Sequence, residues 1–266
     1  MKPEAHPVFV RGAGELASGL AWHLRRAGFP VAMTERPRPL AVRRRVAFSS
    51  AVEPAEWTVE GITARRCAGK AEMRAAWAAG EIALFVDETL APLRFAEFST
   101  LVDARMLKRA DGSIRGLAPL TLWLGPGVEA GVDADFVLET RRGHDLGRVI
   151  RRGQAAPNTG VPGEIGGESA RRVLHSPADG VFEARAEIGE LAEAGQLLGL
   201  VGGTELRAVI PGRLRGLLAD GTEVKKGTKV ADVDPRGEDV DPATISDKCR
   251  ALAGGALTLI LEELGR

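Results

Sequence analysis

The first forty residues of the chain alternate between apolar runs and one stretch with helical spacing. Val8–Arg11 is a short apolar run, and after the small residues of Gly12–Gly14 the stretch Glu15–Ala27 places its apolar residues on one broad helical face. Gly28 ends this pattern, and Val31–Glu35 is the next apolar run. A strand, a glycine-rich turn, a helix and a second strand within about thirty residues are the start of a βαβ unit.

The same alternation continues beyond this unit. It predicts a helix over Ala71–Ala79. It predicts further strands over Ile82–Val86, Thr100–Val102, Leu120–Leu124 and Phe136–Leu138. Helical pieces between strands favour a mostly parallel sheet with helices on both faces. We therefore expect an α/β protein in which residues 1–140 form a Rossmann-like domain.

The composition changes over residues 141–171, which are rich in Gly, Pro, Asn and Arg and show little periodicity. Many of these residue types bend the backbone. Two interpretations stay open: a plain linker, or an ordered loop in which Arg141–Gly163 covers a site.

A glycine repeat marks the next segment, residues 172–236. The spacings of nine and then six residues occur twice, thirty-two residues apart, at Gly180, Gly189, Gly195 and at Gly212, Gly221, Gly227. Two short β units with glycines at their turns predict a small antiparallel β module. The module resembles the barrel-sandwich hybrid of biotinyl and lipoyl carrier domains. Those carriers present a modifiable lysine where this chain has Gly202-Gly203-Thr204, which argues against a swinging-arm carrier.

The last segment, residues 237–266, contains a predicted helix that begins after Ser246 or Asp247 as the N-cap and reaches Leu264. Apolar residues on one side of this helix indicate that it packs back onto the body of the protein. Gly254 and Gly255 weaken a helix, and we therefore expect close packing there.

The composition narrows the classes of partner. Lys+Arg and Asp+Glu number 36 each, and this balance gives no overall field to attract nucleic acid or an anionic membrane. Two cysteines outside any CxxC pattern argue against a disulfide framework, a zinc site or an iron–sulfur cluster, and we expect no metal site. The chain shows no signal-peptide pattern and no apolar run near the roughly 18 residues of a membrane span, so we expect a cytoplasmic protein.

The motif with the clearest mechanism is a G-x-G-x-x-A sequence over residues 12–17, in which Ala13 separates the glycines Gly12 and Gly14 and Ala17 is the last residue. In the dinucleotide fingerprint the first glycine permits the turn, the second lets backbone approach a phosphate, and the third small residue lets helix and strand pack closely. Glu35 stands about twenty residues further on, where an acid binds a ribose hydroxyl. The alternative is a turn that serves packing alone.

Two charged neighbours complicate this interpretation. Glu15 follows Gly14 directly and repels a pyrophosphate unless its side chain points away. Glu35 is followed by Arg36 and Arg38, which either pair with it or accommodate a 2′-phosphate. Both alternatives stay open on the sequence alone.

Other candidate binding residues follow predicted strands or lie in the glycine-rich segment. Ligands in open α/β sheets bind outside the carboxyl ends of strands. The strand-end candidates are Asp87, Asp103, Arg105 and Lys108, and the loop candidates are His144, Asn158 and Thr159. For each of them an ordinary surface position is the alternative. The sequence contains no Ser-His-Asp order, HExxH or Walker A pattern, and it assigns no catalytic residues.

Several motifs together resemble one known family nearly from end to end. They are GAGELASG (12–19), VAMTE (31–35), VDARMLK (102–108), LGPG (124–127), ETRRGHDLGRVI (139–150), PNTGVPG (157–163) and ISDKCRALAGG (245–255). The family is the YqeB-type proteins of the selenium-dependent molybdenum hydroxylase system, or molybdenum cofactor maturation proteins. The first part is also similar to the Rossmann portion of XdhC-type chaperones.

The resemblance implies an accessory role in making or inserting the molybdenum centre of selenium-dependent hydroxylases. The ligand candidates are a nucleotide, either NAD(P) or a cytidine nucleotide, and the molybdenum cofactor itself. The expected protein partner is a molybdenum hydroxylase or another maturation protein. Two other functions stay open: an NAD(P)-dependent oxidoreductase, for which the chain offers no Tyr as proton donor, and a non-catalytic protein-binding scaffold.

Overall fold

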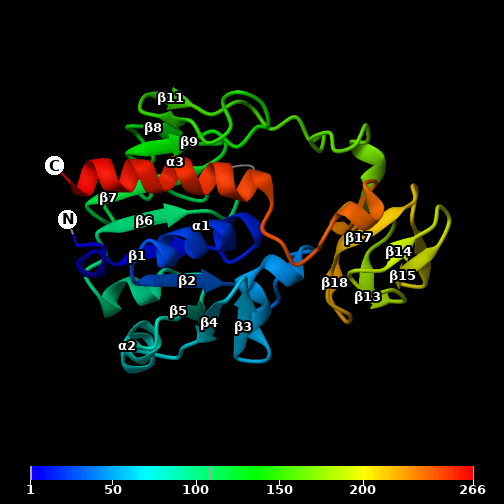
Figure 1. Cartoon of the computed structure of the whole chain (residues 1–266), viewed down its shortest axis with the longest axis horizontal. Coiled ribbons are helices and arrows are strands. Elements are labelled where there is room, and N and C mark those ends of the chain that lie inside the picture. Colours follow the sequence, from blue (N-terminus) through cyan, green and yellow to red (C-terminus); the bar gives the residue numbers. More distant parts are fainter. Residues whose placement is uncertain (1, 108–109, 266) are drawn as a thin grey trace. The chain divides into compact units, whose positions relative to one another are not determined.

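The computed structural model describes residues 2–107 and 110–265. It contains two compact units (Figure 1). The first, called the sheet unit, comprises Met1–Pro39, Ala47–Thr159 and Ile245–Arg266, and the second, called the β unit, comprises Leu40–Val46 and Gly160–Thr244. Short 3-10 helices lie at Pro3–Ala5, Arg44–Val46, Phe48–Val52, Ala91–Phe95, Ala170–Arg172 and Gly237–Asp239.

The sheet unit is built on one nine-stranded sheet over the described residues, with the order β10-β9-β7-β6-β1-β2-β5-β4-β3. Its strands are β1 (Val8–Arg11), β2 (Val31–Glu35), β3 (Glu56–Val59), β4 (Ile62–Arg66), β5 (Ile82–Val86), β6 (Thr100–Asp103), β7 (Leu120–Leu124), β9 (Phe136–Leu138) and β10 (Val149–Ile150). Neighbours pair in parallel except at the two edges, where β10 and β3 run antiparallel to their neighbours. A separate small ladder joins β8 (Glu129–Ala130) to β11 (Gly153–Gln154). The predicted α/β fold with a mostly parallel sheet is confirmed.

The apolar pattern did not predict the edge strand β10 or the hairpin of β3 and β4. Alternate residues of β3 face solvent, including Glu56 and Thr58, so the strand contains no continuous apolar run. Its turn consists of Glu60 and Gly61, both with positive φ, a conformation typical of two-residue hairpin turns. The Glu60-Gly61 pair was therefore the feature of the sequence that could have predicted this hairpin.

Two of the three α-helices of the described chain, α1 (Glu15–Arg26) and α3 (Asp247–Leu264), lie side by side on one face of the sheet (Figure 1). The third is α2 (Lys70–Ala78). A Cβ on Gly19 of α1 would lie 2.6 Å from the Cβ of Cys249, so the two helices approach closely where α1 carries no side chain. The predicted N-cap is confirmed at Ser246, whose Oγ accepts a hydrogen bond from the Cys249 N–H.

The two glycines of α3 differ in their surroundings. A Cβ on Gly255 would collide with the carbonyl oxygen of Gly147, which confirms the predicted close packing at this position. Gly254 faces solvent, and among the described residues no heavy atom lies within 4 Å of the place its Cβ would take. The prediction of close packing was therefore wrong for Gly254.

The β unit contains two four-stranded sheets over its described residues, in the orders β12-β19-β17-β14 and β16-β15-β13-β18. Its strands are β12 (Val173–His175), β13 (Gly180–Ala184), β14 (Leu191–Ala192), β15 (Leu197–Val201), β16 (Thr204–Arg207), β17 (Gly212–Leu217), β18 (Glu223–Val224) and β19 (Lys229–Asp234). The glycine repeat is also a structural repeat, because β13, β14 and β15 begin thirty-two residues before β17, β18 and β19. The middle strand of each half pairs with the first strand of the other half: β14 pairs with β17, and β18 pairs with β13.

A buried ionic network holds the second half of the β unit together. Asp232 is bound by Arg172 at 2.7 Å and by Arg215 at 3.1 Å, and Arg215 also binds Asp234 at 3.0 Å. Burial by itself raises the pKa of Asp232, but the nearby cations outweigh it and lower this pKa to about 2. Arg172 also donates to the carbonyl of Gly163, which fastens the glycine-rich segment to this unit.

Among residues 2–107 and 110–265, no helix has the length and apolar character needed to cross a bilayer.

The contrast between Gly254 and Gly255 gives a matched test of the α3 packing. Gly255→Ala should lower the free energy of unfolding of the sheet unit by about 1–3 kcal/mol because the added methyl overpacks against Gly147. Gly254→Ala should raise it by about 0.5–1 kcal/mol because alanine is the better helix former. All four tryptophans lie in the sheet unit, so urea unfolding followed by tryptophan fluorescence reports on this unit. Equal effects of the two substitutions would contradict the packing.

Candidate functional site

The turn that joins β1 to α1 begins with a glycine required by the fold itself. Gly12 has a φ of +98°, a conformation that other residues rarely adopt. A Cβ here would lie 3.3 Å from the Cα of Arg105, which follows β6. The Gly12 N–H donates to the Thr34 carbonyl at 2.9 Å, which ties the turn to β2. Backbone conformation and lack of space therefore both exclude a larger residue.

Gly14 has no comparable internal reason to be glycine. It is the N-cap of α1 with a φ of −68° and a ψ of −178°, extended backbone that any residue adopts. Among the described residues no heavy atom lies within 4 Å of the place its Cβ would take. The missing side chain leaves open space directly over the start of α1, where backbone N–H groups and the helix dipole attract an anion.

The turn is held rigidly from below by Ser18 of α1. The Ser18 hydroxyl is buried, donates to the Ala13 carbonyl at 2.9 Å and accepts from the Phe48 N–H at 2.7 Å. The Ser49 N–H donates to the same Ala13 carbonyl at 2.9 Å. Because these bonds fix the Ala13 peptide, the turn needs little reorganisation to bind a ligand.

Glu35, the last residue of β2, closes one side of the turn. One carboxylate oxygen accepts the Ala13 N–H at 3.0 Å, and the other accepts the Arg36 N–H at 2.9 Å. Burial raises the pKa of Glu35, and the charge of Glu88 adds to this, although the two backbone hydrogen bonds act in the opposite direction. A carboxylate with a raised pKa beside an open turn is a candidate for a functional group.

Asp103 and Arg105 close the other side of the turn. The Asp103 side chain at the end of β6 is fully buried, and its Oδ2 lies 2.7 Å from Nη2 of Arg105 and 3.4 Å from Nη1 of Arg11. Arg105 also forms a two-pronged ion pair with Asp111, with both N–O distances at 2.6 Å. The predicted residues Gly12, Ala13, Gly14, Glu35, Asp103 and Arg105 therefore lie together at the carboxyl ends of β1, β2 and β6.

The remaining predicted residues are less closely associated with the turn. Asp87 follows β5, two strands from β1, and its carboxylate accepts from the Thr89 hydroxyl at 2.8 Å. Glu15 begins α1, and its Oε1 lies 3.8 Å from Cys249 Sγ, so its carboxylate points toward α3. His144, Asn158 and Thr159 are exposed on loops. Lys108 lies outside the described residues.

Three charged residues near the carboxyl edge were missed by the sequence reasoning. Arg11 was recognisable as the one charged residue of an apolar run, at the position where the strand ends. Asp111 gave no signal, because it belongs to an ordinary Asp-Gly turn. Lys248 lies in the first turn of α3 and is half-buried; burial lowers its pKa, Arg142 lowers it further, and Glu15 acts in the opposite direction.

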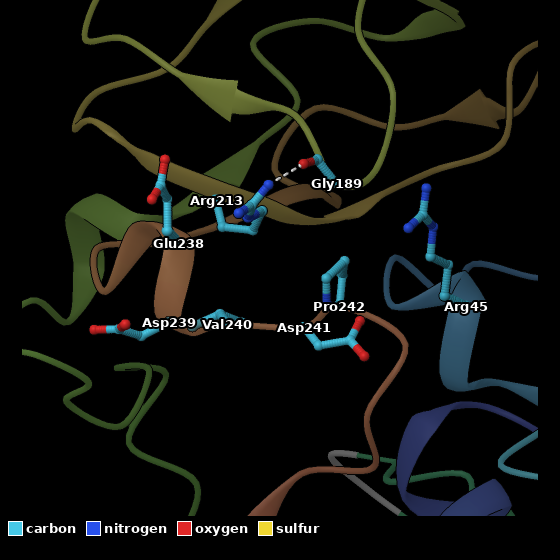
Figure 2. A pocket seen from close by; sticks show the side chains of 8 residues that line it. All are labelled: Arg45, Gly189, Arg213, Glu238, Asp239, Val240, Asp241 and Pro242. Atoms are coloured by element: carbon cyan, nitrogen blue, oxygen red, sulfur yellow. Dashed lines mark hydrogen bonds between the residues drawn. The ribbon is translucent and has the colours of Figure 1, made fainter.

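The β unit has a polar depression of its own, of about 440 Å³. Figure 2 shows Arg213 directed toward the Gly189 carbonyl, to which it donates at 2.6 Å. The lining residues are Arg45, Gly189, Arg213, Glu238, Asp239, Val240, Asp241 and Pro242. A second depression, of about 310 Å³, lies along β10 in the sheet unit. Across the described ranges, no three His, Cys, Asp or Glu side chains are grouped to hold a metal ion.

Comparison with known proteins identifies one informative relative. The chain is homologous to the uncharacterized protein YqeB of Escherichia coli K12, with 43% identity over 266 residues and 98% of this chain covered. The chain spans about half of that relative, 49% of its length. No protein-family model matches the chain.

Solved structures share only a distant likeness. An aspartoacylase family protein from Mesorhizobium loti is 12% identical, with 86% of this chain and 85% of that chain covered and a TM-score of 0.28. A succinylglutamate desuccinylase/aspartoacylase from Rhodobacter sphaeroides is 16% identical with the same coverage and TM-score. The ectoine utilization protein EutE from Ruegeria pomeroyi is 22% identical over 32% of this chain and 28% of that chain, with a TM-score of 0.23. At these TM-scores the likeness bears on neither fold nor function.

The half-buried carboxylate of Glu35 generates a pH prediction. Because its pKa is raised above the ordinary 4.5, the folded state binds the carboxyl proton of Glu35 more tightly than the unfolded chain does. The stability of the fold therefore falls as the pH rises from about 4.5 through the raised pKa. Glu35→Gln removes the cost of the buried charge, so its effect on the free energy of unfolding should be more favourable at pH 7 than at pH 4. Urea unfolding at both pH values tests this, with the exposed Glu53→Gln as the control. An effect of Glu35→Gln that does not change with pH would show that burial does not raise this pKa.

Proposed function

We propose that the sheet unit is Rossmann-like and binds a phosphate-bearing ligand at the Gly12–Gly14 turn. The strand order supports this site, because the chain leaves β1 for β2 on one side and reaches β6 on the other. Such a reversal of strand order creates a crevice at the carboxyl edge of an open α/β sheet, where ligands bind. Gly12, Glu35 and Arg105 all lie at this edge.

One observation carries the proposal: the open N-cap position of Gly14 lies in the turn that Glu35 of β2 and Arg105 after β6 flank. The backbone conformation there accepts any residue, and the described neighbours leave room for a side chain. An external group can approach the backbone at such a position, and its place at the carboxyl ends of β1, β2 and β6, with Arg105 beside the turn, distinguishes Gly14 from Gly69, the equally open N-cap of α2. The group best suited to a helix N-terminus is a phosphate.

The neighbouring acid favours a nucleotide among phosphate-bearing ligands. Each oxygen of Glu35 accepts one backbone N–H and retains a second lone pair for a ribose hydroxyl. NAD(P) and cytidine nucleotides offer such hydroxyls beside their phosphates. The molybdenum cofactor is the other candidate, since it also bears a phosphate.

The wider role that we propose is that of an accessory factor in the maturation of selenium-dependent molybdenum hydroxylases. The family resemblance of the motifs supports this role, and the homology to YqeB over 98% of this chain agrees with the resemblance itself. In this proposal the β unit is a barrel-sandwich hybrid that docks a hydroxylase or another maturation protein. The interlocked halves of the glycine repeat support that architecture, and the Gly202-Gly203 turn leaves no lysine for a swinging arm.

Gly14→Val tests the site. Valine fills the open space over α1, so we expect the Kd of the bound ligand to rise at least about tenfold, equivalent to about 1.4 kcal/mol. The probes are NAD⁺, NADP⁺, CTP, ATP and molybdopterin, first by thermal shift and then by calorimetry for any that bind. Binding of a nicotinamide nucleotide with turnover of a carbonyl substrate would favour an oxidoreductase. Absence of any shift would favour a protein-binding scaffold.

The matched control is Gly69→Val. Gly69 is the N-cap of α2, with extended backbone and, among the described residues, no heavy atom within 4 Å of its Cβ position. Both substitutions should cost a similar 0.5–1 kcal/mol or so of stability, as expected for a poorer N-cap. Equal ligand affinity of the two variants would refute the site at Gly14.

A further inference from the structure

The guanidinium groups of Arg11 and Arg105 meet at the carboxyl ends of β1 and β6. Their inner edges face Asp103, whose Oδ2 lies 3.4 Å from Arg11 Nη1 and 2.7 Å from Arg105 Nη2. The Asp103 side chain is fully buried and belongs to a strand of the sheet. Since this carboxylate cannot leave, it fixes the orientation of both arginines.

The outer edges of the same two arginines hold a different kind of carboxylate. Asp111 Oδ2 lies 2.6 Å from Arg105 Nη1, and Oδ1 lies 2.6 Å from Arg105 Nη2, while Arg11 Nη2 reaches Asp111 at 3.5 Å. The Asp111 side chain is 46% exposed, against 20% for Arg105 and 13% for Arg11. Two parallel N–H···O bonds to one guanidinium are also the geometry in which arginine binds a phosphate.

We propose that Arg11 and Arg105 bind a phosphate group of the ligand through these outer edges, and that the Asp111 carboxylate occupies that place when no ligand is bound. The inference rests on the proposed function, because both arginines belong to the Gly12–Gly14 turn: Arg11 precedes Gly12, and Arg105 lies against it. Asp111 is thus an internal competitor. A ligand that carries a phosphate dianion displaces Asp111 more readily than a ligand that carries a singly charged carboxylate. The site therefore selects for phosphate.

The charge of the competitor does not change in the neutral range. Hydrogen bonds from Arg105 lower the pKa of Asp111 to about 2, and the nearby positive charges act in the same direction. Asp111 therefore competes equally strongly at any pH near 7. The competition is weak enough to be overcome, because a partly exposed ion pair contributes little stability.

Calorimetric titration with inorganic pyrophosphate in chloride-free buffer tests the inference on the full chain. Asp111→Ala removes the competitor and should lower the Kd by up to about fivefold, the most that an exposed ion pair usually contributes. Asp111→Glu keeps the charge and should bind like the wild type. The matched control is Asp145→Ala, which removes an exposed carboxylate paired with Arg148 elsewhere in the sheet unit. In Asp111→Ala, the further change Arg105→Gln should abolish the gain.

Unchanged or weaker pyrophosphate binding by Asp111→Ala, with unfolding like the wild type, would overturn the inference. The proposed function is judged separately, by Gly14→Val and the nucleotide screen. If Gly14→Val abolishes nucleotide binding while Asp111→Ala changes nothing, the site stands and the competitor is wrong. If neither the wild type nor Asp111→Ala binds pyrophosphate, the arginine site is wrong as well.

Discussion

The buried carboxylate of Asp103 is the constraint on which the candidate site depends. A charge without solvent access is costly unless cations and hydrogen bonds surround it, so the chain must bring arginines to the end of β6. Arg105 supplies both its backbone N–H and its side chain to this carboxylate. To do so it folds back against β1, and its backbone then passes so close to Gly12 that a Cβ there would crowd it at 3.3 Å. The buried acid thus adds to the reason for glycine that the positive φ of Gly12 already gives.

Glycines in this protein occupy two different kinds of surroundings. Gly12, Gly19 and Gly255 are confined by neighbouring atoms of the same chain. The fold explains them fully, through a tight turn or a close helix contact. Gly14, like Gly69, has ordinary backbone angles and open space instead, so neither conformation nor contact requires a glycine there. The same comparison distinguishes Gly255 from Gly254, where the open position lies mid-helix and offers no free backbone N–H groups to a ligand.

Much of the fold could be predicted because it depends on short-range patterns. The central parallel strands are buried on both faces and therefore appear as continuous apolar runs; the bounds of β5 and β7 match the prediction residue for residue. The glycine repeat likewise predicted two short β units, and the structure shows equivalent strands that begin at Gly180 and Gly212. The partners of charged residues could not be predicted in this way. Arg11 and Asp111 are a hundred residues apart, and only the pairing of β1 with β6 brings them together.

The two units use buried ion pairs in different ways, and the difference bears on where a ligand can act. In the β unit both carboxylates of the network, Asp232 and Asp234, are buried, so an external anion finds no acid that it can replace. In the sheet unit one carboxylate is buried and the other, Asp111, is nearly half exposed. A buried acid holds the arginines in place while an exposed one can exchange. This combination of a fixed and a replaceable partner suits a binding site, whereas two fixed partners suit a structural brace.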